Sequence, residues 1–160
     1  YPLYNLLKKD VKFDWNEDCE EAFQKVKGIM ASDDVLAHFD PNLNLKLMVD
    51  ASPHGVGAIL SHIYPDKSER PIAYALGTLA ANEKGYSQID KEALAIIYGT
   101  KKFHQYLYGS KFVLCTDHKP LLSIFGSKKG IPGYAAARLQ RYAAIISGFD
   151  FSIEYINSKD

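Results

Sequence analysis

The sequence predicts an α/β domain built on a five-stranded sheet of mixed strand direction, with flanking helices. From residue 43 onward, short apolar runs with strand character alternate with turn residues and with longer stretches of helical periodicity. Their order is β-β-β-α-β-α-α-β. The first three strands have short connections and are expected to pair antiparallel, whereas a strand reached across a long helix usually lies parallel to an earlier one.

The composition indicates one globular domain with a real core. The chain has 160 residues, of which 47% are apolar and 24% are charged. No apolar run approaches the roughly 18 residues that span a bilayer, and Tyr1-Pro2-Leu3-Tyr4 is neither a signal peptide nor an initiator start. We therefore expect a piece of a longer intracellular protein, in which Cys19 and Cys115 are reduced core thiols.

Residues 1–41 are expected to be a connecting segment with one helix, packed on a main domain of residues 42–160. The helix, about Glu17–Ala31, has apolar residues at i, i+3, i+4 and i+7 spacing, and Asn16 is its expected N-cap. Acidic residues in its first turn suit the helix dipole. The apolar stripe consists of Cys19, Ala22, Phe23, Val26, Ile29 and Met30.

The main domain begins with three expected strands, over about residues 45–51, 56–63 and 71–79. Pro53-His54-Gly55 is the turn between the first two strands. These short connections predict an antiparallel meander.

A long helix is expected next, capped by Asn82 or Ser87 and running to about Tyr108, with Gly109 as its stop. The pattern after it is shorter and more broken. The remaining expected elements are a strand over 111–117, a short helix over 120–125, a loop over 128–133, a helix over 134–147 and a strand over 150–156.

Three carboxylates, Asp50, Glu92 and Asp117, are the candidate site. Asp50 and Asp117 each close an apolar strand, and in open α/β sheets the carboxyl ends of strands form the edge where ligands bind. Glu92 lies on the apolar stripe of the long helix, three residues after Ile89 and four before Ile96. Taken singly, each acid fits a turn residue or an ion-pair partner. Taken together, they predict like charges that gather around a cation.

Carboxylate oxygens in such a cluster suit Mg²⁺ or Mn²⁺, and two ions about 3.5–4 Å apart catalyse in-line phosphoryl transfer. Other chemistries lack their motifs. The sequence holds no G-x-S-x-G, Walker A or H-E-x-x-H pattern, and Gly55-Val56-Gly57 does not continue into a dinucleotide-binding loop. His118, beside Asp117, is expected either to touch the substrate or to be a surface histidine.

Charge is unevenly distributed, although the net charge of the chain is zero. Residues 101–149 carry a net charge of +7, because Asp117 is their only acid. Such a segment fits a basic face for phosphate groups or, equally, a solvated surface. Its basic residues are Lys101, Lys102, Lys111, Lys119, Lys128, Lys129, Arg138 and Arg141.

Four ordered motifs carry a family resemblance. They are Val49-Asp50-Ala51-Ser52 with Gly55-Val56-Gly57-Ala58-Ile59-Leu60, Arg70-Pro71-Ile72-Ala73-Tyr74, Lys91-Glu92-Ala93-Leu94-Ala95-Ile96, and Thr116-Asp117-His118-Lys119-Pro120-Leu121. Together they resemble the ribonuclease H domain of reverse transcriptases from gypsy-type long-terminal-repeat retrotransposons, which is part of a Pol polyprotein. The resemblance covers about residues 43–160. The leader, with Phe13-x-Trp15, resembles the segment that joins the polymerase to its ribonuclease H domain.

The resemblance implies a ribonuclease H-like fold and a metal-dependent endonuclease that hydrolyses the RNA strand of RNA–DNA hybrids. It implies that Asp50, Glu92 and Asp117 are three of four catalytic, metal-binding acids, with Mg²⁺ or Mn²⁺ as the cofactor. The fourth acid is expected in an Ala-Asp-x-Leu-Ser-Arg stretch beyond Asp160, together with the closing helix of the fold. The 160-residue chain is therefore expected to cleave weakly.

Ser52, His118 and Lys119 are the expected substrate contacts. The expected partners are an RNA–DNA hybrid and the polymerase domain of the same polyprotein, without a membrane. The alternative is a non-catalytic connection or tether domain of the same fold, which binds nucleic acid or bridges subunits. Degenerate versions of the fold usually lose the acids, which this sequence retains.

Overall fold

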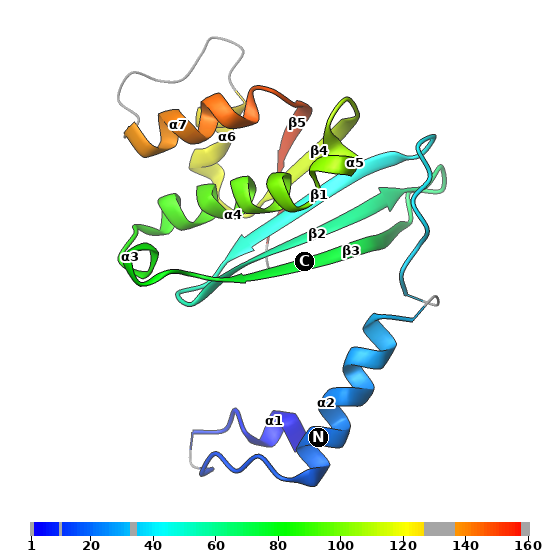
Figure 1. Cartoon of the computed structure of the whole chain (residues 1–160), viewed down its shortest axis with the longest axis vertical. Coiled ribbons are helices and arrows are strands. Elements are labelled where there is room, and N and C mark those ends of the chain that lie inside the picture. Colours follow the sequence, from blue (N-terminus) through cyan, green and yellow to red (C-terminus); the bar gives the residue numbers. More distant parts are fainter. Residues whose placement is uncertain (1, 10, 33–34, 127–136, 158–160) are drawn as a thin grey trace. The chain divides into compact units, whose positions relative to one another are not determined.

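The computed structural model describes residues 2–9, 11–32, 35–126 and 137–157 (Figure 1). The chain forms two compact units, Tyr1–Ala37 and His38–Asp160. No helix in the described ranges is long and apolar enough to cross a membrane.

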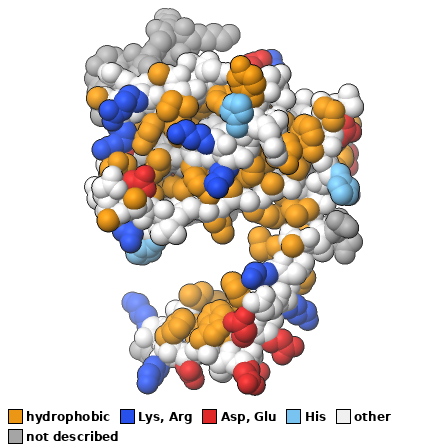
Figure 2. All heavy atoms as spheres, in the orientation of Figure 1, with side chains coloured by type: hydrophobic (Ala, Val, Ile, Leu, Met, Phe, Trp, Pro, Cys, Tyr) orange, Lys and Arg blue, Asp and Glu red, His pale blue; other side chains and the backbone are white. Residues whose placement is uncertain are grey.

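The first unit contains two helices, α1 (Pro2–Asn5) and α2 (Glu17–Met30). Asn16 caps α2 as predicted, because its Oδ1 accepts a hydrogen bond from the backbone N–H of Cys19 at 3.0 Å. Cys19 is also the only buried residue of α2. Within this unit most of the predicted apolar stripe is exposed, and Figure 2 shows hydrophobic side chains at its surface. Packing of the stripe on the second unit stays a prediction. The large exposed side chains of α2 are Phe23, Val26, Ile29 and Met30.

The second unit is built on a five-stranded sheet with the strand order β3-β2-β1-β4-β5. Its strands are β1 (Asn44–Ala51), β2 (Gly55–Ile63), β3 (Glu69–Thr78), β4 (Lys111–Thr116) and β5 (Asp150–Tyr155). The first three pair antiparallel, whereas β4 lies parallel to β1 and β5 parallel to β4. This confirms the predicted mixed sheet. Because β1 and β4 are parallel neighbours, their carboxyl ends meet at the same edge.

The helices of the second unit pack on the sheet, with α4 across β1 and β2 and α6 beside β5 (Figure 1). They are α3 (Ala81–Lys84), α4 (Gln88–Lys102), α5 (His104–Leu107), α6 (Lys119–Phe125) and α7 (Ala137–Ile146). Gly99 allows α4 to approach closely, because a Cβ there would lie 3.0 Å from Ala58 Cβ and 3.2 Å from Val49 Cγ1. The predicted loop over 128–133 and the predicted start of the next helix lie outside the described residues.

The prediction of a single long helix up to Tyr108 was wrong, because the structure has three helices, α3, α4 and α5, in this region. Ser87 is the cap of α4, and its side chain accepts the capping hydrogen bond. Phe103 leaves helical geometry, with φ −102° and ψ 20°, and α5 begins after it. The periodic pattern does not reveal this break, because Phe103 and Leu107 both continue the buried stripe. Gly109 follows α5 with φ +76°, which glycine adopts without strain.

The core of the second unit lies between the sheet and α4. It includes alternate residues of β1 and the stripe of α4 that the periodicity predicts. Cys115 of β4 is fully buried, and burial raises the pKa of its thiol to about 11. Both Cys115 and Cys19 are free and buried, which confirms the prediction of core thiols.

A candidate metal centre

Asp50, Glu92 and Asp117 are held by three elements that meet at one end of the sheet. Asp50 is the penultimate residue of β1, exposed between the buried Val49 and Ala51. Asp117 directly follows β4, at the turn into α6. Glu92 lies in the second turn of α4 and is buried, with 3% of its surface exposed.

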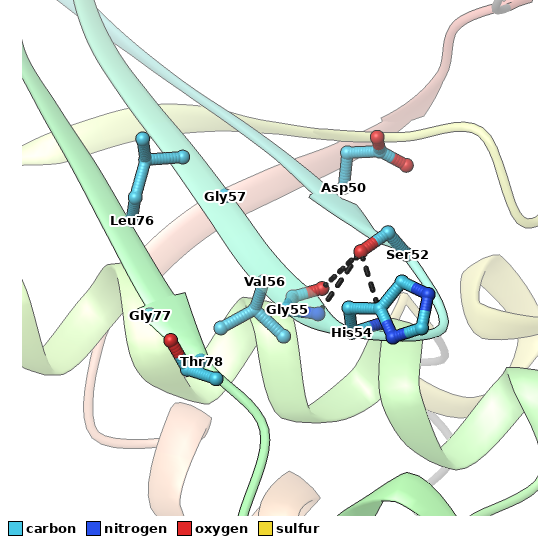
Figure 3. Close-up of a pocket in the computed structure, with 9 residues that line it drawn as sticks. All are labelled: Asp50, Ser52, His54, Gly55, Val56, Gly57, Leu76, Gly77 and Thr78. Atoms are coloured by element: carbon cyan, nitrogen blue, oxygen red, sulfur yellow. Dashed lines mark hydrogen bonds between the residues drawn. The ribbon is translucent and has the colours of Figure 1, made fainter. Parts of the chain in front are cut away.

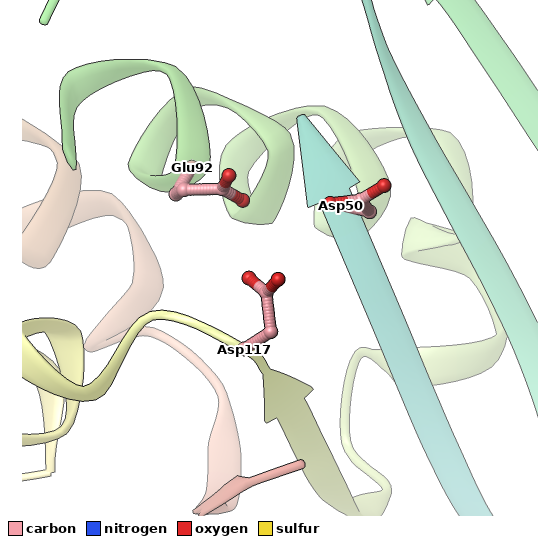
Figure 4. A group of neighbouring side chains, drawn as sticks. All are labelled: Asp50, Glu92 and Asp117. Atoms are coloured by element: carbon pink, nitrogen blue, oxygen red, sulfur yellow. The ribbon is translucent and has the colours of Figure 1, made fainter. Parts of the chain in front are cut away.

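The three carboxyl groups converge on one space. One carboxylate oxygen from each residue lies within 4.8 Å of the others. Figure 4 shows the Glu92 carboxylate reaching from α4, and the Asp117 carboxylate from the end of β4, toward the same space beside Asp50. Glu92 lies 42 positions after Asp50 and 25 before Asp117 in the chain. The parallel pairing of β1 and β4, with α4 packed on the sheet, brings the three residues together.

Glu92 has the most unusual environment of the three acids. Its Oε1 accepts a hydrogen bond from Gln88 Nε2 at 2.5 Å, but its buried Oε2 has no hydrogen-bond partner among the described residues. Burial raises the pKa of Glu92 to about 7, and the charges of Asp117 and Asp50 add to this rise. The bond from Gln88 acts in the opposite direction but does not offset burial.

This arrangement fits a divalent cation. A buried carboxylate oxygen without a donor is costly, and two further carboxylates beside it add repulsion. A bound cation would satisfy the free oxygen and neutralise the repulsion at once. Hard carboxylate oxygens are the ligands that Mg²⁺ and Mn²⁺ prefer.

Ser52 organises the turn between β1 and β2. Its Oγ accepts hydrogen bonds from the backbone N–H groups of His54 at 3.2 Å and Gly55 at 2.9 Å, and it donates to the Gly55 carbonyl oxygen at 3.1 Å (Figure 3). The hydroxyl proton is therefore already used within the turn. Sequence reasoning placed Ser52 near the site but did not foresee this structural role.

A groove of about 500 Å³ begins at Asp50 and crosses β2 to β3 (Figure 3). Its lining includes Gly55, Gly57 and Gly77, which leave backbone in place of side chains. A second hollow of about 210 Å³ lies between the ends of β1 and β4, lined by Asp50, Asp117 and several apolar residues. Neither hollow was predicted from the sequence.

His118 and Lys119 follow Asp117 at the start of α6. His118 is the N-cap residue of α6, and its backbone N–H donates to Thr116 Oγ1 at 3.2 Å. The ammonium of Lys119 lies 4.7 Å from the centre of the Tyr155 ring. Both side chains are thus near the acids in sequence, and Lys119 also has a cation–π partner on β5.

Three lysines of the basic segment, Lys101, Lys102 and Lys111, lie away from the acids. Lys111 begins β4 whereas Asp117 follows its end, a separation of about 20 Å at strand geometry. Lys101 and Lys102 lie at the C-terminal end of α4, about 15 Å along the helix from Glu92. Lys128 and Lys129 lie outside the described residues.

The strand order, the parallel β1–β4 pair and the acidic cluster at its carboxyl edge together define a ribonuclease H-like domain. Comparison with known families agrees: the chain belongs to the RNase H-like domains found in reverse transcriptase, whose sequence profile matches residues 15–114.

Relatives of known sequence are retrotransposon polyproteins. The chain is 36% identical over 160 residues to the retrovirus-related Pol polyprotein from transposon 297 of Drosophila melanogaster. The match covers 99% of this chain and 14% of that polyprotein, so the chain spans about one seventh of its relative. This confirms the resemblance seen in the sequence motifs.

Solved structures with the same fold include viral reverse transcriptases and a free-standing ribonuclease. The native prototype foamy virus protease–reverse transcriptase matches with a TM-score of 0.66 and 17% identity, covering 98% of this chain and 21% of that one. The foamy viral enzyme in complex with an RNA/DNA hybrid matches with a TM-score of 0.57 and 14% identity, covering 98% and 21%. RNase H1 from Halobacterium salinarum matches with a TM-score of 0.52 and 14% identity, covering 72% and 87%. These likenesses confirm the predicted fold.

Proposed function

We propose that this chain is a metal-dependent ribonuclease H domain that hydrolyses the RNA strand of RNA–DNA hybrids within a retroelement reverse transcriptase. The observation that carries the proposal is the free, buried Oε2 of Glu92 beside Asp50 and Asp117. A purely structural role would leave that oxygen without a partner, whereas a divalent ion satisfies it. The cofactor is Mg²⁺ or Mn²⁺, with two ions at the site.

The three acids have different roles because their exposure differs. Asp50 and Asp117 reach solvent at the ends of β1 and β4, where they would hold the ions. Glu92 is buried, so it would hold one ion from the protein side and orient the attacking water. Divalent ions, when bound, activate the water and stabilise the leaving oxygen of the phosphodiester.

The groove that begins at Asp50 supports a nucleic-acid strand as the substrate. At Gly57, where a side chain would contact only Leu76, the strand backbone allows a sugar–phosphate chain to approach closely. Ser52, at the start of the groove, is the proposed contact to a 2′-hydroxyl, which distinguishes RNA from DNA, and this contact would replace one of the hydrogen bonds that Oγ makes within the turn. On the other side of Asp50, His118 and Lys119 are the proposed contacts to the substrate backbone.

The partners follow from the family. The foamy viral enzyme of the same fold binds an RNA/DNA hybrid, and we extend that substrate class to this chain. The relatives are much longer Pol polyproteins, so the polymerase part of the same polyprotein is the proposed protein partner. Residues 1–41 are proposed to be the segment that connects the two.

The test is cleavage of a hybrid labelled separately on its RNA and DNA strands, in Mg²⁺ and in Mn²⁺. The 160-residue chain and the same chain extended along its parent sequence are compared. We expect cleavage of the RNA strand alone, lost in Asp50→Asn. Asp150→Asn is the matched control, because Asp150 is an exposed acid at the start of β5, where its backbone lies opposite Lys111 and thus at the end of β4 away from Asp117.

Cleavage that persists in Asp50→Asn would contradict the assigned site. If neither chain cleaves the hybrid in either Mg²⁺ or Mn²⁺, the nuclease function is overturned, and hybrid binding without cleavage would then favour the tether function. Activity in the extended chain alone would support the nuclease and assign the difference to the added residues.

A further inference from the structure

Gln88, the first residue of α4, connects Glu92 to the end of β1. Its amide nitrogen donates to Glu92 Oε1 at 2.5 Å and to the carbonyl oxygen of Ala51 at 3.1 Å. Ala51 is the residue directly after Asp50. One side chain therefore joins two of the three elements that form the acidic cluster.

We propose that Gln88 is a positioning residue that sets the carboxylate of Glu92 for metal binding. This inference depends on the proposed metal-dependent function and extends it to a residue that carries no charge. Both N–H groups of the amide are used, one for each acceptor. The bond to Oε1 leaves Oε2 as the oxygen without a partner, and Oε2 is then free for the ion.

The bond matters because a glutamate side chain has three rotatable torsions, which must be fixed for a metal ligand to be pre-organised. Glu92 is fixed at its backbone by α4 and at its carboxylate by Gln88. Partners that orient a metal-binding carboxylate in this way commonly contribute to metal affinity. The hydrogen bond to the Ala51 carbonyl oxygen fixes the position of the Gln88 amide relative to the sheet.

Gln88 is itself held by the start of α4. Ser87, the N-cap residue, donates from Oγ to Asp90 Oδ2 at 2.7 Å, and Asp90 pairs with Arg138 of α7 at 3.1 Å. The first turn of α4 is thus fixed from the side of α7, and Gln88 fixes it to β1. The backbone from which the amide extends is therefore fixed, and the amide itself is held by Glu92 and Ala51.

Gln88 is exposed as a residue, so a substitution there removes the two hydrogen bonds without opening the core. Gln88→Met keeps the length and shape of the side chain and removes the donors. Gln24→Met is the matched control, because Gln24 Nε2 makes the same kind of bond to Glu20, four residues away on α2, at 2.6 Å. Only the Gln88 bond serves the acidic cluster.

The experiment measures Mg²⁺ binding to the 160-residue chain by titration calorimetry without substrate. We expect Gln88→Met to bind Mg²⁺ about tenfold more weakly than the wild type and Gln24→Met to match the wild type. The melting temperatures of all three proteins are measured in EDTA alongside. A Gln88→Met isotherm that overlays the wild type would overturn the inference. A lower melting temperature with unchanged Mg²⁺ affinity would also overturn it and assign Gln88 a merely structural role.

Kinetics in the extended chain give the second readout. Gln88→Met should need more Mg²⁺ for half-maximal cleavage, recover its kcat at saturating Mg²⁺, and keep the KM for the hybrid. A raised KM with an unchanged Mg²⁺ requirement would show a substrate contact instead and overturn the inference. Asp50→Asn distinguishes failure of the metal site from failure of the Gln88 inference. If the Mg²⁺ isotherm of Asp50→Asn equals that of the wild type, the proposed metal site itself is wrong, whatever the result for Gln88→Met.

Discussion

Glu92 and Asp117 face each other across the gap between α4 and the end of β4, with carboxylate oxygens within 4.8 Å. Neither carboxylate has a cationic partner among the described residues at this point, and the pKa of Glu92 is raised to about 7, first by its burial and then by Asp117 and Asp50. In the metal-free protein, this pair therefore opposes folding. Metal binding would turn the same pair into a favourable contact.

Replacing Glu92 with glutamine should stabilise the metal-free protein. Glu92→Gln removes a buried charge and its repulsion with Asp117, so we expect the free energy of unfolding at pH 8 to rise by about 1–2 kcal/mol. Urea denaturation in EDTA measures this. Glu83→Gln is the control, because Glu83 accepts a hydrogen bond from the Ala80 N–H in an exposed cap, and we expect a change within about 0.5 kcal/mol. A loss of about 1–3 kcal/mol in Glu92→Gln would instead indicate a structural hydrogen-bond partner.

The stability of the metal-free protein should fall as the pH rises from about 4.5 to 7. Because the folded-state pKa of Glu92 is raised from 4.5 to about 7, the folded state holds this proton more tightly than the unfolded state. The contribution of Glu92 to the free energy of unfolding is complete below pH 4.5 and is lost as the pH rises through 7. One pKa unit corresponds to about 1.4 kcal/mol, and after solvent screening at the open side of the cluster we expect about 1–2 kcal/mol in total.

The difference between the wild type and Glu92→Gln isolates this contribution, because the other titrating groups are common to both proteins. Melting curves in EDTA at several pH values should show that difference growing between pH 4.5 and 7. Saturating Mg²⁺ should remove the trend in the wild type, because the ion binds the deprotonated carboxylate. A pH-independent difference would contradict the assigned pKa.

The sheet was predictable because each strand carries its own signal. Alternating burial along β1, turn residues such as Pro53-His54-Gly55, and the helix before β4 determine which strands pair and in which direction. The break at Phe103 was not predictable, because it changes the backbone without interrupting the apolar pattern.

The acidic cluster was predictable in part for the same reason. Strand ends and a helix stripe place Asp50, Asp117 and Glu92 at one edge once β1 and β4 are neighbours. Gln88 could have been found from its spacing, four residues before Glu92, which is the distance for a helical side-chain pair. The second hydrogen bond of Gln88, to Ala51, could not be predicted, because Ala51 lies 37 positions away in the chain.

His62 should hold the start of the second unit to β2. Its ring is fully buried and stacks on Phe39, and its Nε2 accepts a hydrogen bond from the backbone N–H of Asp40 at 2.9 Å. His62→Leu leaves that N–H without its acceptor, so we expect a loss of about 1–3 kcal/mol in stability. Hydrogen exchange of the Asp40 amide should become faster than in the wild type. Unchanged protection of this amide would show that the hydrogen bond is not formed in solution.

Gly77 should be required for the contact between α4 and the edge strand β3. A Cβ at Gly77 would lie 2.8 Å from Tyr98 Cε2, and Tyr98 Oη donates to the Leu76 carbonyl oxygen at 2.5 Å. Gly77→Ala must therefore displace the tyrosine ring, and we expect a loss of about 1–3 kcal/mol in the free energy of unfolding. In a Tyr98→Leu background the same substitution should have a smaller effect, with a coupling energy of about 1 kcal/mol or more.

Gly57→Ala is the matched control on the neighbouring strand. Its Cβ would meet only Leu76 Cδ2, at 3.6 Å, which is an ordinary contact. Because alanine also loses less backbone entropy on folding than glycine, we expect Gly57→Ala to be neutral or stabilising by up to about 1 kcal/mol. Urea denaturation of the wild type, Gly77→Ala, Tyr98→Leu and the Gly77→Ala/Tyr98→Leu double variant completes the double-mutant cycle, and Gly57→Ala is measured beside them. Equal effects of Gly77→Ala in both backgrounds would show that the Tyr98 ring is not what excludes a side chain at Gly77.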